Sequence, residues 1–168
     1  MNKIFEKLTN QLTETIDSSV ALALHNKNQE VEVIHLLWAL LTNTNSVLNQ
    51  LLNKMNVNKV AIELEAKSYA SKLPSVSSVT KESIKLSRNL LASLQNAEGL
   101  MASFGDKFIA VDTWLISNLD SSVIKDVLGK YVDLKEAKKE LEAMRAGKTI
   151  DSNSGDENLE ALNKYGID

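Results

Sequence analysis

The chain has 168 residues, enough for one domain whose core buries about two thirds of the surface of the unfolded chain. Its net charge of −3, with acidic and basic residues interspersed, provides no broad basic face, so we expect no nucleic acid partner. The longest apolar stretch, near 36–41, cannot cross a bilayer, and residues 1–15 lack the apolar run of a signal peptide, so we expect no membrane partner and a cytoplasmic location.

Helix is the favoured state nearly throughout, because the chain has six glycines, one proline and few aromatic or β-branched runs. Apolar residues from Phe5 to Val20 recur at steps of three and four, the spacing of one helical face. Asn58 is a plausible cap, and Pro74 ends the last helix of this half. The predicted helices span 5–26, 33–41, 47–55 and 59–73. We therefore expect an all-α fold.

The apolar pattern then begins again. A constant offset, 90 − 12 = 78, pairs Leu12 with Leu90 and continues without a gap to Leu41 and Leu119. Beyond the next loop the offset changes to 124 − 48 = 76 for Leu48 and Ile124, and to 141 − 64 = 77 for Leu64 and Leu141. A chance alignment of leucines is the alternative, but the matching order and loop positions favour duplication.

The duplication predicts one pseudo-two-fold domain of eight helices, because each half alone is too short to bury its apolar faces well. Repeat one is expected over about 2–73 and repeat two over about 80–146, with the longer helices 5–26 and 81–104 at the centre. Asp133 and Glu136 form a capping box for the eighth helix, which runs to Arg145 and whose many charges predict an exposed face.

From Gly147 the apolar periodicity is lost and turn-forming residues dominate, which predicts a linker over 147–168. Within it, Leu159 and Leu162 have helical spacing over 156–165, a helix too short to fold alone. Such a helix would dock on another part of a longer protein.

The residues that could carry chemistry form no catalytic or metal-binding pattern. Gly147-Lys148-Thr149 resembles the end of a phosphate-binding loop, but Glu142 stands where that loop needs a glycine. His25 and His35 belong to different predicted helices, and the chain has no cysteine. We therefore expect no catalytic, cofactor-binding or metal-binding residue, the alternative being a free-standing helical enzyme or small-ligand binder.

Two aromatic positions and one turn remain as candidate contact points. Core packing is favoured over ligand contact for Trp38 and Trp114, which lie in short apolar helices. Gly105 suits a helix end, and Asp106 and Phe108 follow it in a turn that can present an apolar side chain beside an acid.

Two segments carry a resemblance to a known family. A duplicated four-helix unit with VIHLLWALL in one half and GDKFIAVDTWLISNL in the other resembles the Clp amino-terminal repeat domain over residues 2–146. The following AGKTIDSNSGDENLEALNKYGID is similar to the connector of ClpB-type disaggregases. The alternative within the family is the adaptor-docking domain of a ClpA-type or ClpC-type protease-coupled unfoldase.

The resemblance implies a domain that engages unfolded or aggregated polypeptides for a hexameric machine acting with the DnaK system. ATP and magnesium would belong to the ATPase modules of the full-length parent, which this chain lacks, so the chain should be monomeric and hydrolyse nothing.

The resemblance also implies a set of substrate-binding residues. Three are polar positions expected on the domain surface, Thr9, Asp106 and Asp112, the last replacing the glutamate usual in the family. Thr9 could equally be a helix cap, since it pairs with Ser87 by the offset of 78. An adjacent apolar groove is expected to be lined by Leu94, Phe108, Thr113 and Trp114. Val33 and Ile34 stand where the family often has proline and glutamate.

Overall fold

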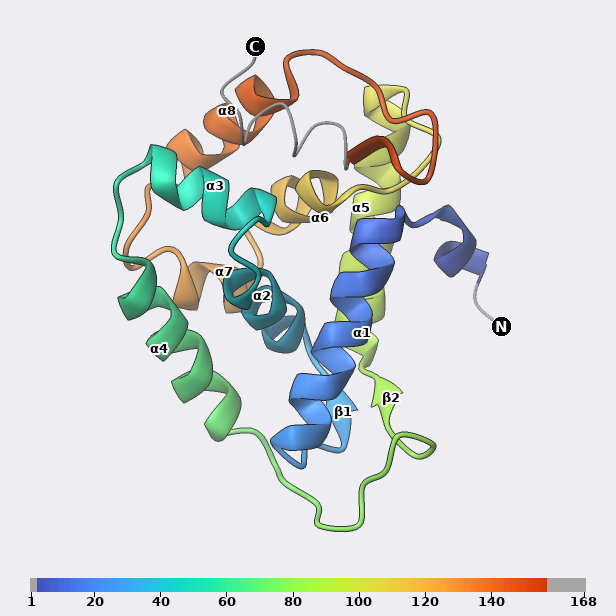
Figure 1. The fold of residues 1–168 in the computed structure, drawn as a ribbon, viewed down its shortest axis with the longest axis vertical. Coiled ribbons are helices and arrows are strands. Elements are labelled where there is room, and N and C mark those ends of the chain that lie inside the picture. Colours follow the sequence, from blue (N-terminus) through green and yellow to red (C-terminus); the bar gives the residue numbers. More distant parts are fainter. Residues whose placement is uncertain (1–2, 157–168) are drawn as a thin grey trace.

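The computed structural model of the chain describes residues 3–156. Eight α-helices, one short 3-10 helix and two two-residue strands form the described part of the chain (Figure 1). Their bounds are η1 Lys3–Lys7, α1 Asn10–His25, β1 Glu30–Val31, α2 Val33–Thr42, α3 Val47–Lys54, α4 Lys59–Ser71, β2 Lys85–Leu86, α5 Arg88–Phe104, α6 Val111–Asn118, α7 Ser122–Val127 and α8 Leu134–Arg145. The all-α prediction is confirmed. The predicted helix over 156–165 lies outside the described residues, apart from its first residue.

Helices α1–α4 and α5–α8 repeat one arrangement, as the sequence predicts. α1 packs on α2, and α5 packs on α6 in the same way. Two short parallel pairings relate the halves: Val31 pairs with Leu86 and Leu8 pairs with Ile109. The offset of 78 converts one pairing into the other, since 8 + 78 = 86 and 31 + 78 = 109. The backbone amide of Thr9 donates to the carbonyl of Ile109, and the amide of Ser87 donates to the carbonyl of Val31. The residue that precedes the long helix of each repeat is therefore held by a hydrogen bond to the other repeat.

The two long helices begin later than predicted because a hydroxyl caps each one. The Thr9 side chain accepts a hydrogen bond from the Leu12 amide, and the Ser87 side chain accepts one from the Leu90 amide. A capping side chain fixes the first helical residue just after itself. The helices therefore begin at Asn10 and Arg88, and not at 5 and 81.

Leu48 and Ile124 are both fully buried, in agreement with the offset of 76 for the third helix of each repeat. The fourth helix of each repeat follows an offset of 75, which corrects the sequence-based offset of 77. Asn58 and Asp133 cap α4 and α8 with their side chains, and 133 − 58 = 75. At this offset Ala66, not Leu64, is the equivalent of Leu141. Burial agrees, because Leu64 is 60% exposed, whereas Ala66 and Leu141 are fully buried.

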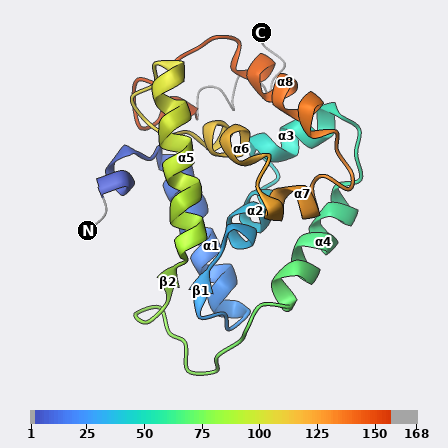
Figure 2. The same ribbon diagram turned by 180° about the vertical axis from the view of Figure 1, so that it is seen from behind.

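The centre of the fold is α2, and not the two long helices. Every residue of α2 from Val33 to Leu41 is buried, whereas α1 and α5 bury only one face. α2 contacts α1, α3, α4, α5 and α7, which surround it (Figure 2). Trp38 and Trp114 are both buried, as predicted for core residues. Over residues 3–156, no helix has the length and apolar character needed to cross a membrane.

Candidate substrate-binding site

A buried ionic cluster lies beneath the turn that follows α5. Gly105 ends the helix in the left-handed conformation that glycine adopts easily, which aims Asp106 inward. Arg145, the last residue of α8, binds Asp106 through Nη1 and Asp112 through both Nε and Nη2. Its Nη2 also donates to the Thr113 hydroxyl at 2.9 Å. One guanidinium thus holds the carboxylates of Asp106 and Asp112, both of which are distant from Arg145 in the sequence.

Arg145 is buried yet remains charged. Its side chain is 5% exposed, and its guanidinium lies 5.0 Å from the centre of the Phe104 ring. Burial acts to lower the pKa of Arg145, but hydrogen bonds from the guanidinium to Asp112 and Asp106, together with their charges, outweigh burial and raise it above its ordinary value. The cluster is therefore a fixed structural tie between α8, α6 and the turn.

A second buried carboxylate, Asp156, lies between the starts of α1 and α6. Its Oδ2 accepts a 2.8 Å hydrogen bond from the Thr9 hydroxyl and a 3.4 Å bond from the Val111 amide. Its Oδ1 is buried without a hydrogen-bond partner in the described structure. Burial raises the pKa of Asp156 to about 6, and the charge of Asp112 adds to this, while the bonds from Thr9 and Val111 oppose it.

Residues 147–156, called the return segment below, pack over Asp106 and carry Asp156 to the start of α1. The Ile150 amide donates to Asp106 Oδ1 at 2.8 Å, and the Ile150 carbonyl accepts from the Lys107 amide at 2.8 Å. The Asn153 carbonyl accepts from the Asn10 amide at 2.7 Å. A Cβ atom at Gly155 would lie 2.9 Å from the Ile150 side chain, so only glycine permits this close packing. The first ten residues of the predicted linker therefore lie against the domain.

The expectation that the three polar site residues lie on the surface is wrong. Thr9 is 0% exposed, and Asp106 and Asp112 are each 6% exposed, because each binds a partner within the chain. Leu94, Thr113 and Trp114 are also fully buried, so in this arrangement they cannot form the surface of a groove. Phe108 is partly exposed and is the member of the predicted set that a partner can reach. The structure thus gathers Thr9, Asp106, Asp112 and Thr113 around one buried region.

Repeat one holds a neutral counterpart of the ionic cluster. By the offset of 78, Asn28 is the equivalent of Asp106 and His35 is the equivalent of Thr113, and these two side chains are joined by a 2.8 Å hydrogen bond. By the offset of 75, Ala70 is the equivalent of Arg145, and its carbonyl accepts from Asn26. Burial lowers the pKa of His35 to about 4, so this histidine is neutral at pH 7. Only repeat two therefore has the charged cluster.

The burial of Asp156 predicts that the stability of the domain depends on pH. Its pKa is raised from 3.8 to about 6, so its contribution to stability is fully present below pH 3.8 and is lost as the pH rises through 6. A displacement of this size corresponds to roughly 3 kcal/mol. Urea unfolding gives the free energy of unfolding of wild type and of Asp156→Asn at each pH. The value for wild type minus that for the variant should therefore fall as the pH rises from 4 to 6.5. His35 titrates in the same range but is common to both proteins, so it cancels; a pH-independent difference would contradict the prediction.

An apolar groove lies on repeat two, at a different place from the predicted one. Its volume is about 550 Å³, and its walls come from α5, α6, α7 and the start of α8. The lining residues are Leu100, Ile116, Ser117, Leu119, Asp120, Lys125, Leu134, Lys135 and Lys138. Leu100 and Leu134 are partly exposed, whereas Ile116 and Leu119 are buried as the floor. This groove can receive an apolar side chain from a partner.

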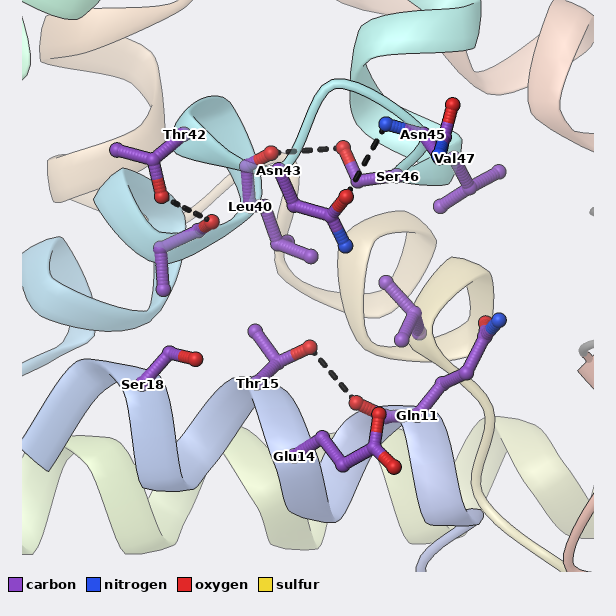
Figure 3. A pocket seen from close by; sticks show the side chains of 12 residues that line it. Gln11, Glu14, Thr15, Ser18, Leu40, Thr42, Asn43, Asn45, Ser46 and Val47 are labelled. Carbon is purple, nitrogen blue, oxygen red and sulfur yellow. Dashed lines mark hydrogen bonds between the residues drawn. The ribbon is translucent and has the colours of Figure 1, made fainter.

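A second hollow, of about 310 Å³, is polar. Side chains of α1 face the end of α2 and the start of α3 across it (Figure 3). The hydroxyls of Thr15, Thr42 and Ser46 each donate to a backbone carbonyl, so they are already engaged. Glu14 is the one ionisable side chain of its lining. The hollow therefore lacks the convergent base and nucleophile of a hydrolytic site, and residues 3–156 contain no group of three metal-ligating side chains.

The family model of the Clp repeat (R) N-terminal domain matches residues 7–131, about three quarters of the chain. The chain belongs to the Clp repeat N-terminal domain family. It is also 56% identical, over 164 residues, to the chaperone protein ClpB of Wolinella succinogenes, covering 98% of this chain and 19% of that protein. The resemblance found in the sequence is thus confirmed, and the chain corresponds to the N-terminal domain of ClpB.

Solved Clp N-terminal domains share the fold. The Hsp104 N-terminal domain of Candida albicans superposes with a TM-score of 0.80 at 21% identity, covering 89% of this chain and 99% of that one. A ClpV N-domain in complex with a VipB peptide superposes with a TM-score of 0.65 at 18% identity, covering 87% and 91%. The chain spans about a fifth of the length of the ClpB chaperone that it matches.

Proposed function

We propose that this chain is the domain with which a ClpB-type disaggregase engages unfolded or aggregated proteins. The full-length parent would be a hexameric AAA+ ATPase of the cytoplasm that uses ATP and magnesium and refolds stress-damaged proteins with the DnaK system. The chain itself would be monomeric and would bind clients without hydrolysing nucleotide. Its 56% sequence identity to a ClpB chaperone supports this role over that of an adaptor-docking domain in a protease-coupled unfoldase.

The observation that carries the proposal is the apolar groove between α5, α6, α7 and α8. Leu100 and Leu134 are partly exposed above a floor of Ile116 and Leu119, so the groove can shield an apolar client side chain from water. An N-domain of the same fold has been solved with a peptide bound, which supports peptide binding by this fold. A groove of this size gives modest affinity, and six tethered copies would raise the effective concentration of the client.

The polar residues named from the family resemblance would act indirectly in this proposal. Asp106 and Asp112 hold Arg145, and Thr9 holds Asp156, so together they fix the turn 105–110 and the return segment. Phe108, on that turn, would be a second contact point for clients. Leu94, Thr113 and Trp114 would support the turn and α6 from the core.

Client binding by the chain should weaken severalfold when the groove is made polar. Leu134→Ser removes an apolar, partly exposed side chain at the first position of α8, where helix formation tolerates serine. Binding of a fluorescent unfolded polypeptide is measured by anisotropy, and contacted residues are mapped by NMR chemical shifts. Val60→Ser is the matched control, because Val60 is 68% exposed on α4, outside the groove.

Phe108→Ser separates the two contact points. If only Phe108→Ser weakens binding, the client contacts the turn and not the groove. If neither variant changes the affinity, or if wild type binds no unfolded polypeptide at high concentration, the chain does not engage clients through these surfaces.

A further inference from the structure

Three lysines surround the apolar groove on one side of repeat two. Lys125 lies on α7, and Lys135 and Lys138 lie on the first turns of α8, all with exposed side chains. Asp120 is the single acid of the lining, so the groove carries a local charge of 3 − 1 = +2. Lys125, Lys135 and Lys138 are called the basic rim below. The whole chain has a net charge of −3, so the positive charge of this rim is a local feature and does not follow from the composition.

These lysines have no ion pair with any side chain of residues 3–156, although paired lysines lie close in sequence. Lys130 pairs with Glu65 at 3.3 Å, and Lys139 pairs with Glu136 at 3.7 Å. The charges of the rim are therefore available to an incoming partner. The methylene stems of lysine can extend an apolar floor while the ammonium groups stay in water, so the rim places positive charge at the edge of the apolar surface.

We propose that the groove selects client segments in which apolar residues are flanked by acidic residues. This inference rests on the proposed function and adds the class of segment that the groove prefers. Aspartate and glutamate beside the apolar residues would lie against Lys125, Lys135 and Lys138, while lysine or arginine there would be repelled. Complementary charge at the edge of an interface sets specificity and the rate of encounter, and it is screened by salt.

The test uses three fluorescent peptides with the same apolar centre and with glutamate, serine or lysine flanks. Their dissociation constants are measured by anisotropy with the whole chain at low and high ionic strength. We expect the glutamate-flanked peptide to bind about tenfold more tightly than the lysine-flanked one at low salt, since exposed ion pairs each contribute modestly. The preference should shrink towards equality near 0.5 M salt.

A matched pair of triple variants assigns the preference to the rim. Lys125→Ser/Lys135→Ser/Lys138→Ser should abolish it, whereas Lys59→Ser/Lys81→Ser/Lys85→Ser, which removes the same charge from exposed positions outside the groove, should retain it. Equal loss in both variants would show an effect of net charge and would overturn the proposal. Equal binding of all three peptides by wild type would also overturn it, while leaving the proposed function intact. If no peptide binds, the proposed function itself fails.

Discussion

Replacing Arg145 with alanine is expected to destabilise the domain by about 3–5 kcal/mol, because it leaves two buried carboxylates without their cation. Asp106 and Asp112 are both buried, and Arg145 supplies four side-chain hydrogen bonds in this region. The variant also loses the contact of the guanidinium with Phe104. Urea unfolding followed by circular dichroism measures the loss.

The neutral cluster of repeat one supplies the control. The triple variant Asp106→Asn/Asp112→Ile/Arg145→Met places asparagine and isoleucine where Asn28 and Ile34 stand in the other repeat, and fills the space of the arginine. A buried ion pair replaced as a whole by apolar residues of similar volume often costs little. We therefore expect the triple variant to be within about 2 kcal/mol of wild type. If it is as unstable as Arg145→Ala, the loss comes from packing and not from unpaired charge.

The repeat could be predicted from the sequence because apolar spacing survives duplication. Leucines of α1 and α2 recur 78 residues later, and the structure preserves this offset in the caps Thr9 and Ser87 and in both strand pairings. The offset of the fourth helices is harder to predict, because α8 is highly charged and the spacing of leucines points to Leu64, which is exposed. The caps Asn58 and Asp133 would have given the correct value.

The role of Arg145 could not be predicted from its surroundings in sequence. It ends a run of lysines and glutamates, which is typical of a solvated helix face, yet the chain folds back so that its side chain enters the core. The two acids that it binds are more than thirty residues away, so only the fold brings them together. Asp156 was missed for the same reason, since it lies in a segment without apolar periodicity.

The family resemblance named residues that lie together in the fold, but it did not predict that they are buried. Thr9, Asp106 and Asp112 do converge, and they do so beneath the return segment. Proximity to the motif predicts Leu94 and Trp114 as groove residues, whereas helical spacing places both side chains on the core face. The apolar groove lies elsewhere, because its residues come from α5, α6, α7 and α8, which only tertiary packing brings together.

Replacing Trp114 with alanine is expected to cost about 3–5 kcal/mol, because the side chain is fully buried and truncation leaves a large cavity. A phenylalanine substitution separates packing from hydrogen bonding. Trp114 Nε1 donates to the Ser93 hydroxyl at 2.9 Å, whereas Trp38 Nε1 is buried and has no hydrogen-bond partner within residues 3–156. Trp114→Phe should therefore destabilise the domain more than Trp38→Phe, by about 1 kcal/mol.

The Trp114→Phe variant also tests whether Trp114 contacts clients. A core residue changes the free energy of unfolding and leaves the affinity of the folded domain for an unfolded polypeptide unchanged. Equilibrium urea unfolding and peptide anisotropy, measured on the same Trp114→Phe protein well below its unfolding midpoint, give both quantities. If affinity falls while stability is retained, Trp114 becomes accessible to clients, which requires α6 or the turn 105–110 to move away from the core. Unchanged affinity with reduced stability would restrict the client contacts to Phe108 and to the groove of α5, α6, α7 and α8.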